Sequence, residues 1–146
     1  MSKRILVPID LTEDGDAVAP IAASLARSSG GTIRLLHVAP IPQELYADHG
    51  RVVVYADQEM ARVEAEGQHA LGDVEACLDG VPVETVVRFG EPAEEILREA
   101  EAFGADLIAL AAPRPRWLRL GRGVAGRVLR ASPRPVMVFH HADAAA

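Results

Sequence analysis

Cysteine, aromatic residues and long apolar runs are all scarce in this chain of 146 residues. The one cysteine, Cys77, excludes a disulfide within the chain, which fits a reducing compartment. No stretch approaches the roughly 20 apolar residues that cross a bilayer, and the first apolar run stops at Pro8, too early for a signal peptide. We therefore expect a cytoplasmic protein without membrane contact, folded as one domain over residues 1–141, with a short alanine-rich tail at 142–146.

Acidic residues are absent between Asp106 and Asp143, although the chain contains 21 of them. Up to and including Asp106 there are 8 basic and 20 acidic residues, whereas the remainder holds 7 basic residues and 1 acidic residue. The 7 basic residues of this arginine-rich segment are Arg114, Arg116, Arg119, Arg122, Arg127, Arg130 and Arg134. A positive loop that follows a parallel strand is a common position for an anionic ligand in an open α/β sheet.

Five short apolar runs are typical of strands, at residues 4–9, 32–38, 83–89, 106–111 and 135–139. Most are continuously apolar rather than alternating, as expected of strands that are covered on both faces. Amphipathic helical patterns separate them. This alternation predicts a three-layer α/β domain with a five-stranded parallel sheet in the Rossmann-like order 3-2-1-4-5. In that order the loops after the first and fourth strands face one crevice.

The helical patterns have recognisable ends. We expect Thr12 to cap the first helix, which carries Leu25 on its apolar stripe, and Glu91-Pro92 to begin the third, which stops at Gly104. Cys77 lies on the stripe of the second helix and is interpreted as core filler. The connection at 39–55 is long, and we favour a surface loop over a lid for it.

With that order established, the chain resembles the universal stress protein family along nearly its whole length. The matching pieces are Lys3-Arg-Ile-Leu-Val-Pro-Ile-Asp10, Ala22-Ala-Ser-Leu-Ala26, Ile33-Arg-Leu-Leu-His-Val38, Gly90-Glu-Pro-Ala-Glu-Glu-Ile-Leu97, Ala105-Asp-Leu-Ile-Ala-Leu110 and Arg127-Val-Leu-Arg-Ala-Ser-Pro-Arg-Pro-Val-Met-Val138. Each piece alone is weak, but the set in this order is specific. The resemblance implies an adenine nucleotide alpha hydrolase-like version of the fold and a dimeric stress-response protein.

The resemblance also implies where a nucleotide would bind. Members that bind ATP carry a glycine-rich loop after the fourth strand, closed by Gly-Ser or Gly-Thr, whose amides surround phosphate. Here Ala111 and Arg114 replace two of the glycines, and Arg122-Gly123 replaces the closing pair. The candidate nucleotide or anion pocket comprises Pro8, Ile9, Asp10 and Val38 on the base side, and Ala111, Arg114, Arg122, Gly123 and Val124 on the phosphate side.

Two interpretations of the altered loop remain open. In the first, its alanine, arginine and proline side chains close the pocket, and the arginines are solvated or paired with acids. In the second, arginine side chains replace the lost amides as phosphate donors. We favour the first, because a glycine nest is pre-organised whereas long side chains must be ordered on binding. The prediction is therefore that no cofactor is needed, with ATP or a bound phosphate or sulfate as the alternative.

Catalysis and metal binding have little support in the sequence. A phospho-acceptor site at Asp10 would need further acids and a lysine at the end of the last strand. Glu13 and Asp14 are instead interpreted as acids that favour the macrodipole of the first helix, and the only lysine is Lys3. The histidines lack metal-ligand spacing. No Ser-His-Asp or Cys-His arrangement is present, so we expect no enzyme. Trp117 lies among arginines, but the net charge of −6 makes nucleic acid an unfavoured partner.

The last strand, residues 136–139, is apolar and lies at a sheet edge in the predicted order. An exposed apolar edge needs covering. The family resemblance implies that Val136 to Phe139 pair with the same strand of a second subunit. We therefore predict a homodimer with twofold symmetry.

Overall fold

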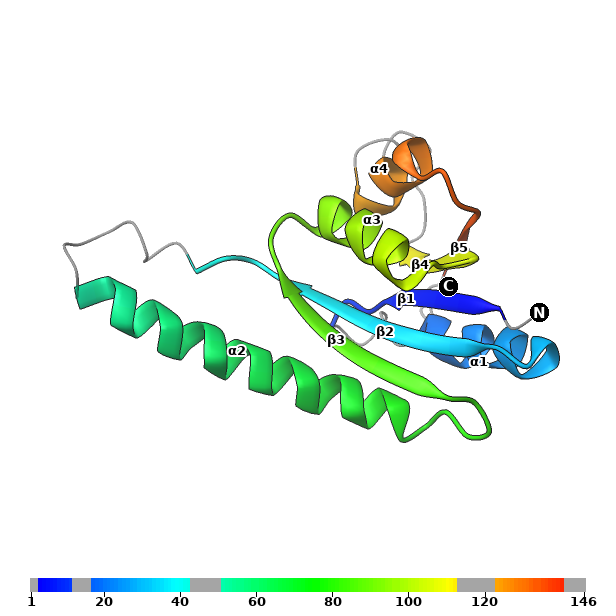
Figure 1. Ribbon diagram of the computed structural model, residues 1–146, viewed down its shortest axis with the longest axis horizontal. Coiled ribbons are helices and arrows are strands. Elements are labelled where there is room, and N and C mark those ends of the chain that lie inside the picture. The colour runs from blue at the N-terminus through cyan, green and yellow to red at the C-terminus, as the bar shows by residue number, and fades with distance from the viewer. Residues whose placement is uncertain (1–2, 12–16, 43–50, 113–122, 141–146) are drawn as a thin grey trace, which may run out of the picture.

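The computed structural model describes residues 3–11, 17–42, 51–112 and 123–140. Its sheet has five parallel strands in the order β3-β2-β1-β4-β5 (Figure 1). The strands are β1 (Arg4–Pro8), β2 (Thr32–Ala39), β3 (Val83–Phe89), β4 (Leu107–Ala112) and β5 (Val136–His140). The predicted α/β class and strand order are confirmed, with strand ends that differ from the expected ones by one residue at most.

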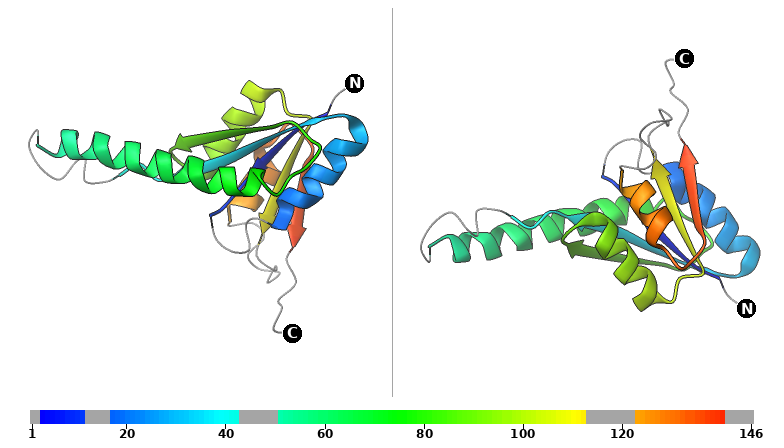
Figure 2. Two further views of the ribbon diagram at one scale, coloured as in Figure 1. Left: turned by 90° about the horizontal axis from the view of Figure 1, so that it is seen from below. Right: turned by 90° about the horizontal axis from the view of Figure 1, so that it is seen from above.

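Helices cover both faces of the sheet, as Figures 1 and 2 show. α1 (Val18–Ser29) and α2 (Arg51–Glu75) lie on one face, and α3 (Pro92–Phe103) and α4 (Val124–Ala131) on the other. Neighbouring residues of a strand point to opposite faces. Val7 accordingly belongs to the core cluster under α1 and α2, and Leu6 to the cluster under α3 and α4, both with no exposed surface.

α3 begins and ends where the sequence predicts. Glu91 is its N-cap, and the Glu91 carboxylate accepts a hydrogen bond of 2.8 Å from the backbone N–H of Glu94. Pro92 follows as the first helical residue, which needs no N–H donor. Gly104 ends the helix with a φ of 67°, a left-handed conformation that glycine adopts without strain.

α1 differs from the prediction at its start and on its apolar face. Its N-cap is Ala17, and Thr12, the expected cap, lies outside the described residues. Leu25 is 41% exposed, so its assignment to the buried stripe was wrong. The residues that face the sheet are Val18, Ala19, Ala22, Ala23 and Ala26. Small side chains let the helix lie close to the strands, which leaves the larger leucine on the outer face.

α2 corrects two further predictions. It begins at Arg51, so residues 51–55 are helical and do not belong to a surface loop or a lid. Helix propagation is cooperative, and no glycine or proline interrupts the sequence from Arg51 until Gly67. The helix ends at Glu75, and Cys77, expected in the core, is exposed, while Leu78 is buried. The N-terminal part of α2 reaches beyond the ends of β2 and β3 (Figure 1).

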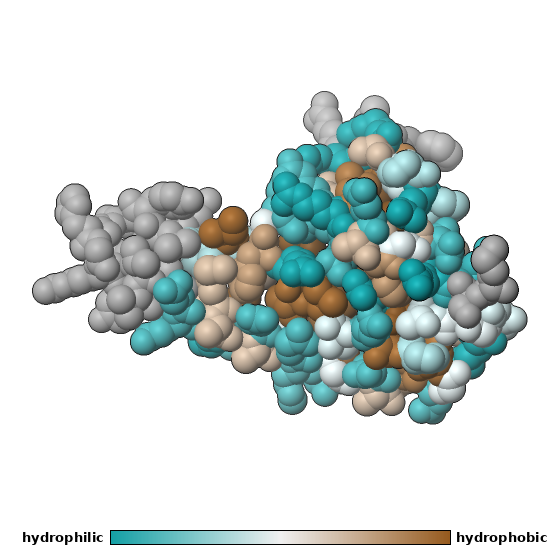
Figure 3. Space-filling view, viewed as in Figure 1, coloured by the Kyte–Doolittle hydropathy of each residue, from teal (hydrophilic) through white to brown (hydrophobic). Residues whose placement is uncertain are grey.

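Part of the sheet on the α3 side has no helix over it. Figure 3 shows apolar surface among polar side chains over β2 and β3, next to α3. Val38 and Val86 are half-buried there and pack against the core cluster of α3 and α4. None of the helices in the described ranges is both long and apolar enough to span a bilayer.

Candidate functional site

Three segments of the predicted pocket come together at one edge of the sheet. β1 and β4 are parallel neighbours, with Ile5 opposite Leu107, so the turn after β1 and the end of β4 lie at the same edge. α4 leads back to the opposite edge, where β5 begins, and its first residues therefore also lie at the carboxyl edge. This edge is the switch point of a doubly wound sheet, where such folds commonly bind ligands.

The turn after β1 is held by backbone hydrogen bonds. The Ile9 N–H donates to the Leu36 carbonyl at 2.7 Å, and the Ile9 side chain is only 3% exposed. The Ile9 carbonyl lies 3.3 Å from Nδ1 of His37, and because a carbonyl only accepts, Nδ1 must carry the hydrogen. The next residue, Asp10, is exposed. Ile9 thus anchors the turn in the core, and Asp10 is presented at the edge.

The predicted base-side residues fall on both faces of the sheet. Val38 packs toward α3, in the cluster that contains Leu6 and Leu36. Pro8 alternates with Val7 and Ile9 along β1 and so points to that same side. The Ile9 side chain belongs to the other core cluster, under α1 and α2. Pro8, Asp10 and Val38 remain the base-side candidates whose side chains are at least partly open to solvent.

The phosphate side is only partly described. Ala111 is a strand residue in register with Phe139, and its half-buried side chain packs against the core cluster under α1. Gly123 is the N-cap of α4, with extended backbone and no side-chain hydrogen bond, and Val124 is 38% exposed. Arg114 and Arg122 lie outside the described residues.

No described atom lies close to the Cβ position of Gly123. A Cβ built on this residue would meet no atom within 4 Å in the described part of the structure. Its φ of −84° suits any residue, so a larger side chain would fit without backbone strain.

The comparisons with known proteins decide the family. A sequence model of the universal stress protein family matches residues 1–140. The chain belongs to the universal stress protein family. No curated protein sequence matches it.

Several solved structures share the fold of this chain. The hypothetical protein MJ0577 matches with a TM-score of 0.78 at 23% identity, over 99% of each chain. A universal stress protein in complex with cAMP matches with a TM-score of 0.68 at 17% identity, over 95% of this chain and 97% of that one. The universal stress protein from Archaeoglobus fulgidus in complex with dAMP matches with a TM-score of 0.62 at 20% identity, over 94% of this chain and 98% of that one. At these identities the likeness shows a shared fold.

Arginines of the arginine-rich segment are engaged by the protein itself. Arg134 donates to the Ala105 carbonyl at 2.6 Å. Arg127, in α4, forms an ion pair with Glu91, the N-cap of α3. The Glu94 N–H, and with it the Arg127 guanidinium, lowers the pKa of the Glu91 carboxyl below its usual range.

Sequence reasoning missed the Glu91–Arg127 pair. It treated Glu91 as a helix start and Arg127 as one of several positive charges. The residues are 36 positions apart, and only the packing of α3 beside α4 brings them together. The sequence did offer one signal for the pair: Glu91 caps α3 and Arg127 lies one turn into α4, and both helices begin at the carboxyl edge of the sheet.

A buried charge cluster was also missed. Glu99 of α3 is 3% exposed, and its carboxylate accepts from Arg34 of β2 at 2.7 Å and from Arg88 of β3 at 3.0 Å. The Arg34 guanidinium also bonds Glu84 and lies 4.3 Å from the centre of the Phe103 ring. The buried Glu99 carboxylate is engaged by two arginines within the fold, so this cluster ties α3 to the sheet.

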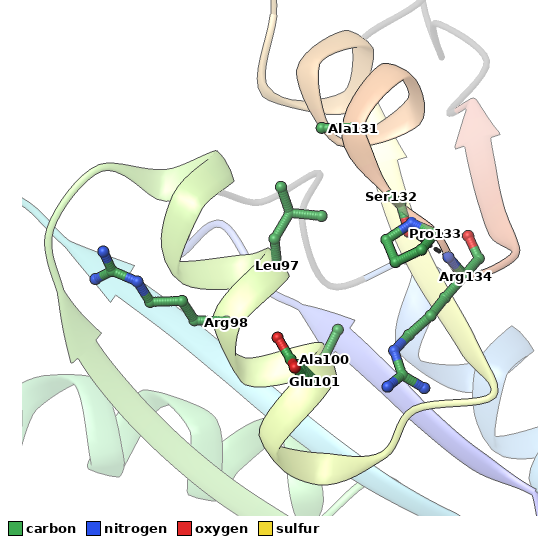
Figure 4. A pocket seen from close by; sticks show the side chains of 8 residues that line it. All are labelled: Leu97, Arg98, Ala100, Glu101, Ala131, Ser132, Pro133 and Arg134. Atoms are coloured by element: carbon green, nitrogen blue, oxygen red, sulfur yellow. Dashed lines mark hydrogen bonds between the residues drawn. The ribbon is translucent and has the colours of Figure 1, made fainter.

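A pocket lies away from this edge. This pocket of about 310 Å³ is bounded by the last turns of α3 and by the segment from the end of α4 to β5, at the amino ends of the strands (Figure 4). Its lining residues are Leu97, Arg98, Ala100, Glu101, Ala131, Ser132, Pro133 and Arg134. In the described residues no group of three His, Cys, Asp or Glu side chains is arranged to hold a metal ion.

Proposed function

We propose that this chain is a noncatalytic, homodimeric stress-response protein whose nucleotide site has lost tight binding of ATP. The observation that carries this proposal is the state of β4. Its backbone stays extended and paired through Ala111 and Ala112, opposite Phe139 and His140. Extended strand backbone does not curl its amides around a phosphate, as the backbone of a glycine-rich loop does. The half-buried Ala111 methyl group, moreover, packs against the core cluster under α1.

The charge at the start of α4 supports the same proposal. A bound phosphate would need the positive end of this helix and nearby cations. Arg127, one turn into α4, is already paired with Glu91. This pairing agrees with the interpretation in which arginines of the segment bond to acids of the same chain.

A nucleotide-dependent switch is the second candidate. Two structural relatives were solved in complex with cAMP and with dAMP. In this chain the space in front of Gly123 is not filled by any described atom, and Asp10 is exposed at the same edge. Arginine donors from the segment, with Arg114 and Arg122 as the first choices, would then hold the phosphates.

Titration with ATP separates the two. The protein is stripped of nucleotide and titrated while heat and Trp117 fluorescence are followed. We expect no saturable signal up to millimolar ATP and no hydrolysis. Micromolar binding that Arg114→Ala and Arg122→Ala weaken would instead establish the switch.

The dimer part of the proposal depends on β5. This strand is at the end of the sheet, and its residues 136–139 are half-buried in the single chain. An edge strand carries unpaired N–H and C=O groups, which a second copy of the strand would satisfy around a twofold axis. We expect sedimentation to give twice the chain mass, and Met137→Lys to shift the protein toward monomer. A wild-type monomer at all concentrations would contradict this part alone.

A further inference from the structure

The Glu91 carboxylate bridges the starts of two helices. One carboxylate oxygen accepts the Glu94 N–H of α3 at 2.8 Å, and the other is paired with the guanidinium of Arg127 in α4. Both oxygens are therefore engaged. The Glu91 side chain keeps 33% of its surface exposed and the Arg127 side chain 46%, so solvent and small ions reach the pair.

α4 has no anionic group of its own at its start. Its first turn contains no acid, and its N-cap Gly123 has no side chain to accept a hydrogen bond. The backbone N–H of Arg127 donates to the Gly123 carbonyl at 3.1 Å, which places Arg127 one turn into α4. Helical side chains point back toward the N-terminus, which brings the Arg127 side chain near the first turn. An acid of the neighbouring helix, Glu91, instead pairs with the Arg127 side chain of α4.

We propose that the Glu91 carboxylate competes with anions for Arg127 at this edge of the sheet. It holds the Arg127 guanidinium until a phosphate group displaces it. This inference rests on the proposed function, because it takes the start of α4 as the phosphate side of the site. A phosphate that enters meets repulsion from Glu91 and finds Arg127 already engaged. After displacement, the planar guanidinium is free to bind two phosphate oxygens.

A single substitution isolates the effect. Glu91→Ser keeps an N-cap for α3, because serine caps helices well, but it removes the charge that holds Arg127. We expect the binding of inorganic phosphate, titrated at low salt, to become roughly two- to fivefold tighter than in the wild type, the range that exposed ion pairs imply. A purely structural role for Glu91 would leave the affinity unchanged or reduce it.

Two variants serve as controls. Glu94→Gln changes the net charge by the same amount as Glu91→Ser, and at the start of the same helix. Glu94 is exposed and has no described side-chain contact to Arg127. Its affinity for phosphate should stay at the wild-type value. Adding Arg127→Gln to Glu91→Ser should abolish the gain. Circular dichroism and thermal unfolding check that α3 remains folded in each variant.

Each result has a distinct meaning. A gain in Glu91→Ser that is absent in Glu94→Gln and lost with Arg127→Gln supports the competitor. Equal phosphate affinity in wild type and Glu91→Ser, or a gain of the same size in Glu94→Gln, overturns it and leaves the proposed function standing. If no variant binds phosphate, the proposed competition by Glu91 is also overturned, although that result agrees with a closed site. Tight ATP binding by the wild type contradicts the proposed function instead.

Discussion

Two charge clusters at α3 differ in what surrounds them. Glu99, near the middle of the helix, is 3% exposed and is held by Arg34 and Arg88 from two strands. Glu91, at the helix start, is partly exposed and is held by Arg127 of a neighbouring helix. A buried charge that loses a partner has no water to replace it, whereas an exposed one does. The first cluster is therefore a permanent part of the fold, and the second can be exchanged for a ligand.

The cluster around Glu99 should give the largest effect on stability. Arg34→Met keeps the apolar stem but leaves Glu99 with only the half-exposed Arg88 as a partner. We expect the free energy of unfolding to fall by about 3 kcal/mol, measured by urea denaturation.

The matched control lies on α2. Arg62 also pairs with two acids, Glu59 and Glu66, but all three are substantially exposed. Arg62→Met should change the free energy of unfolding little. Equal losses in the two variants would show that burial does not distinguish the clusters.

Replacing Arg88, the more exposed arginine of the same cluster, should lower the free energy of unfolding by a smaller amount. The Arg88 side chain is 51% exposed, and Glu99 keeps Arg34 when Arg88 is removed. Arg88→Met should therefore cost about 1 kcal/mol in urea denaturation. A loss as large as that of Arg34→Met would place Arg88, rather than Arg34, as the main partner of Glu99.

The Glu91 pair should appear in the pH dependence of stability. The pKa of Glu91 is lowered in the folded chain from its ordinary value of 4.5, by the Glu94 N–H first and also by Arg127. Its contribution is then complete above that ordinary value and is lost as the pH falls through the lower folded pKa.

Thermal unfolding followed from about pH 6 to pH 3 measures this contribution. Wild type should lose more stability over that range than Glu91→Ser, in which no carboxylate titrates at this position. Parallel curves for the two proteins would show that the Glu91 charge does not contribute to folding.

The smallest effect is expected at the start of α4. Gly123→Ser places an N-cap side chain where the backbone is extended and the Cβ meets no described atom. The gain in stability should be a few tenths of a kcal/mol, because glycine is itself an acceptable cap. Differential scanning calorimetry measures it, and a loss of stability would mean that the space before Gly123 is occupied.

The elements that were predicted correctly all carry local signals. Pro92 and Gly104 are recognised from their own backbone preferences, and the strand at 83–89 from its apolar run. The predictions that failed concern which side chains of a helix are buried and which residues form ion pairs. Leu25 and Cys77 are apolar residues in or next to helices, yet neighbouring side chains, not their own hydrophobicity, decide that both are exposed. The candidate residues Arg114 and Arg122 lie outside the described residues, so their roles stay predictions.

The apolar periodicity of the chain, with the glycine and proline residues that bound its helices, was enough to predict the α/β class and the strand order. It also predicted that Asp10 and the start of the arginine-rich segment follow strands at the same edge of the sheet. These features follow from rules that act over a few residues and from the fixed hand of the crossovers. Which acid holds which arginine was decided by packing, since α3 beside α4 joins Glu91 to Arg127 and α3 over β2 and β3 joins Glu99 to Arg34 and Arg88. Pairs so far apart in the chain leave no local pattern, because their distance is set only once the helices lie on the sheet.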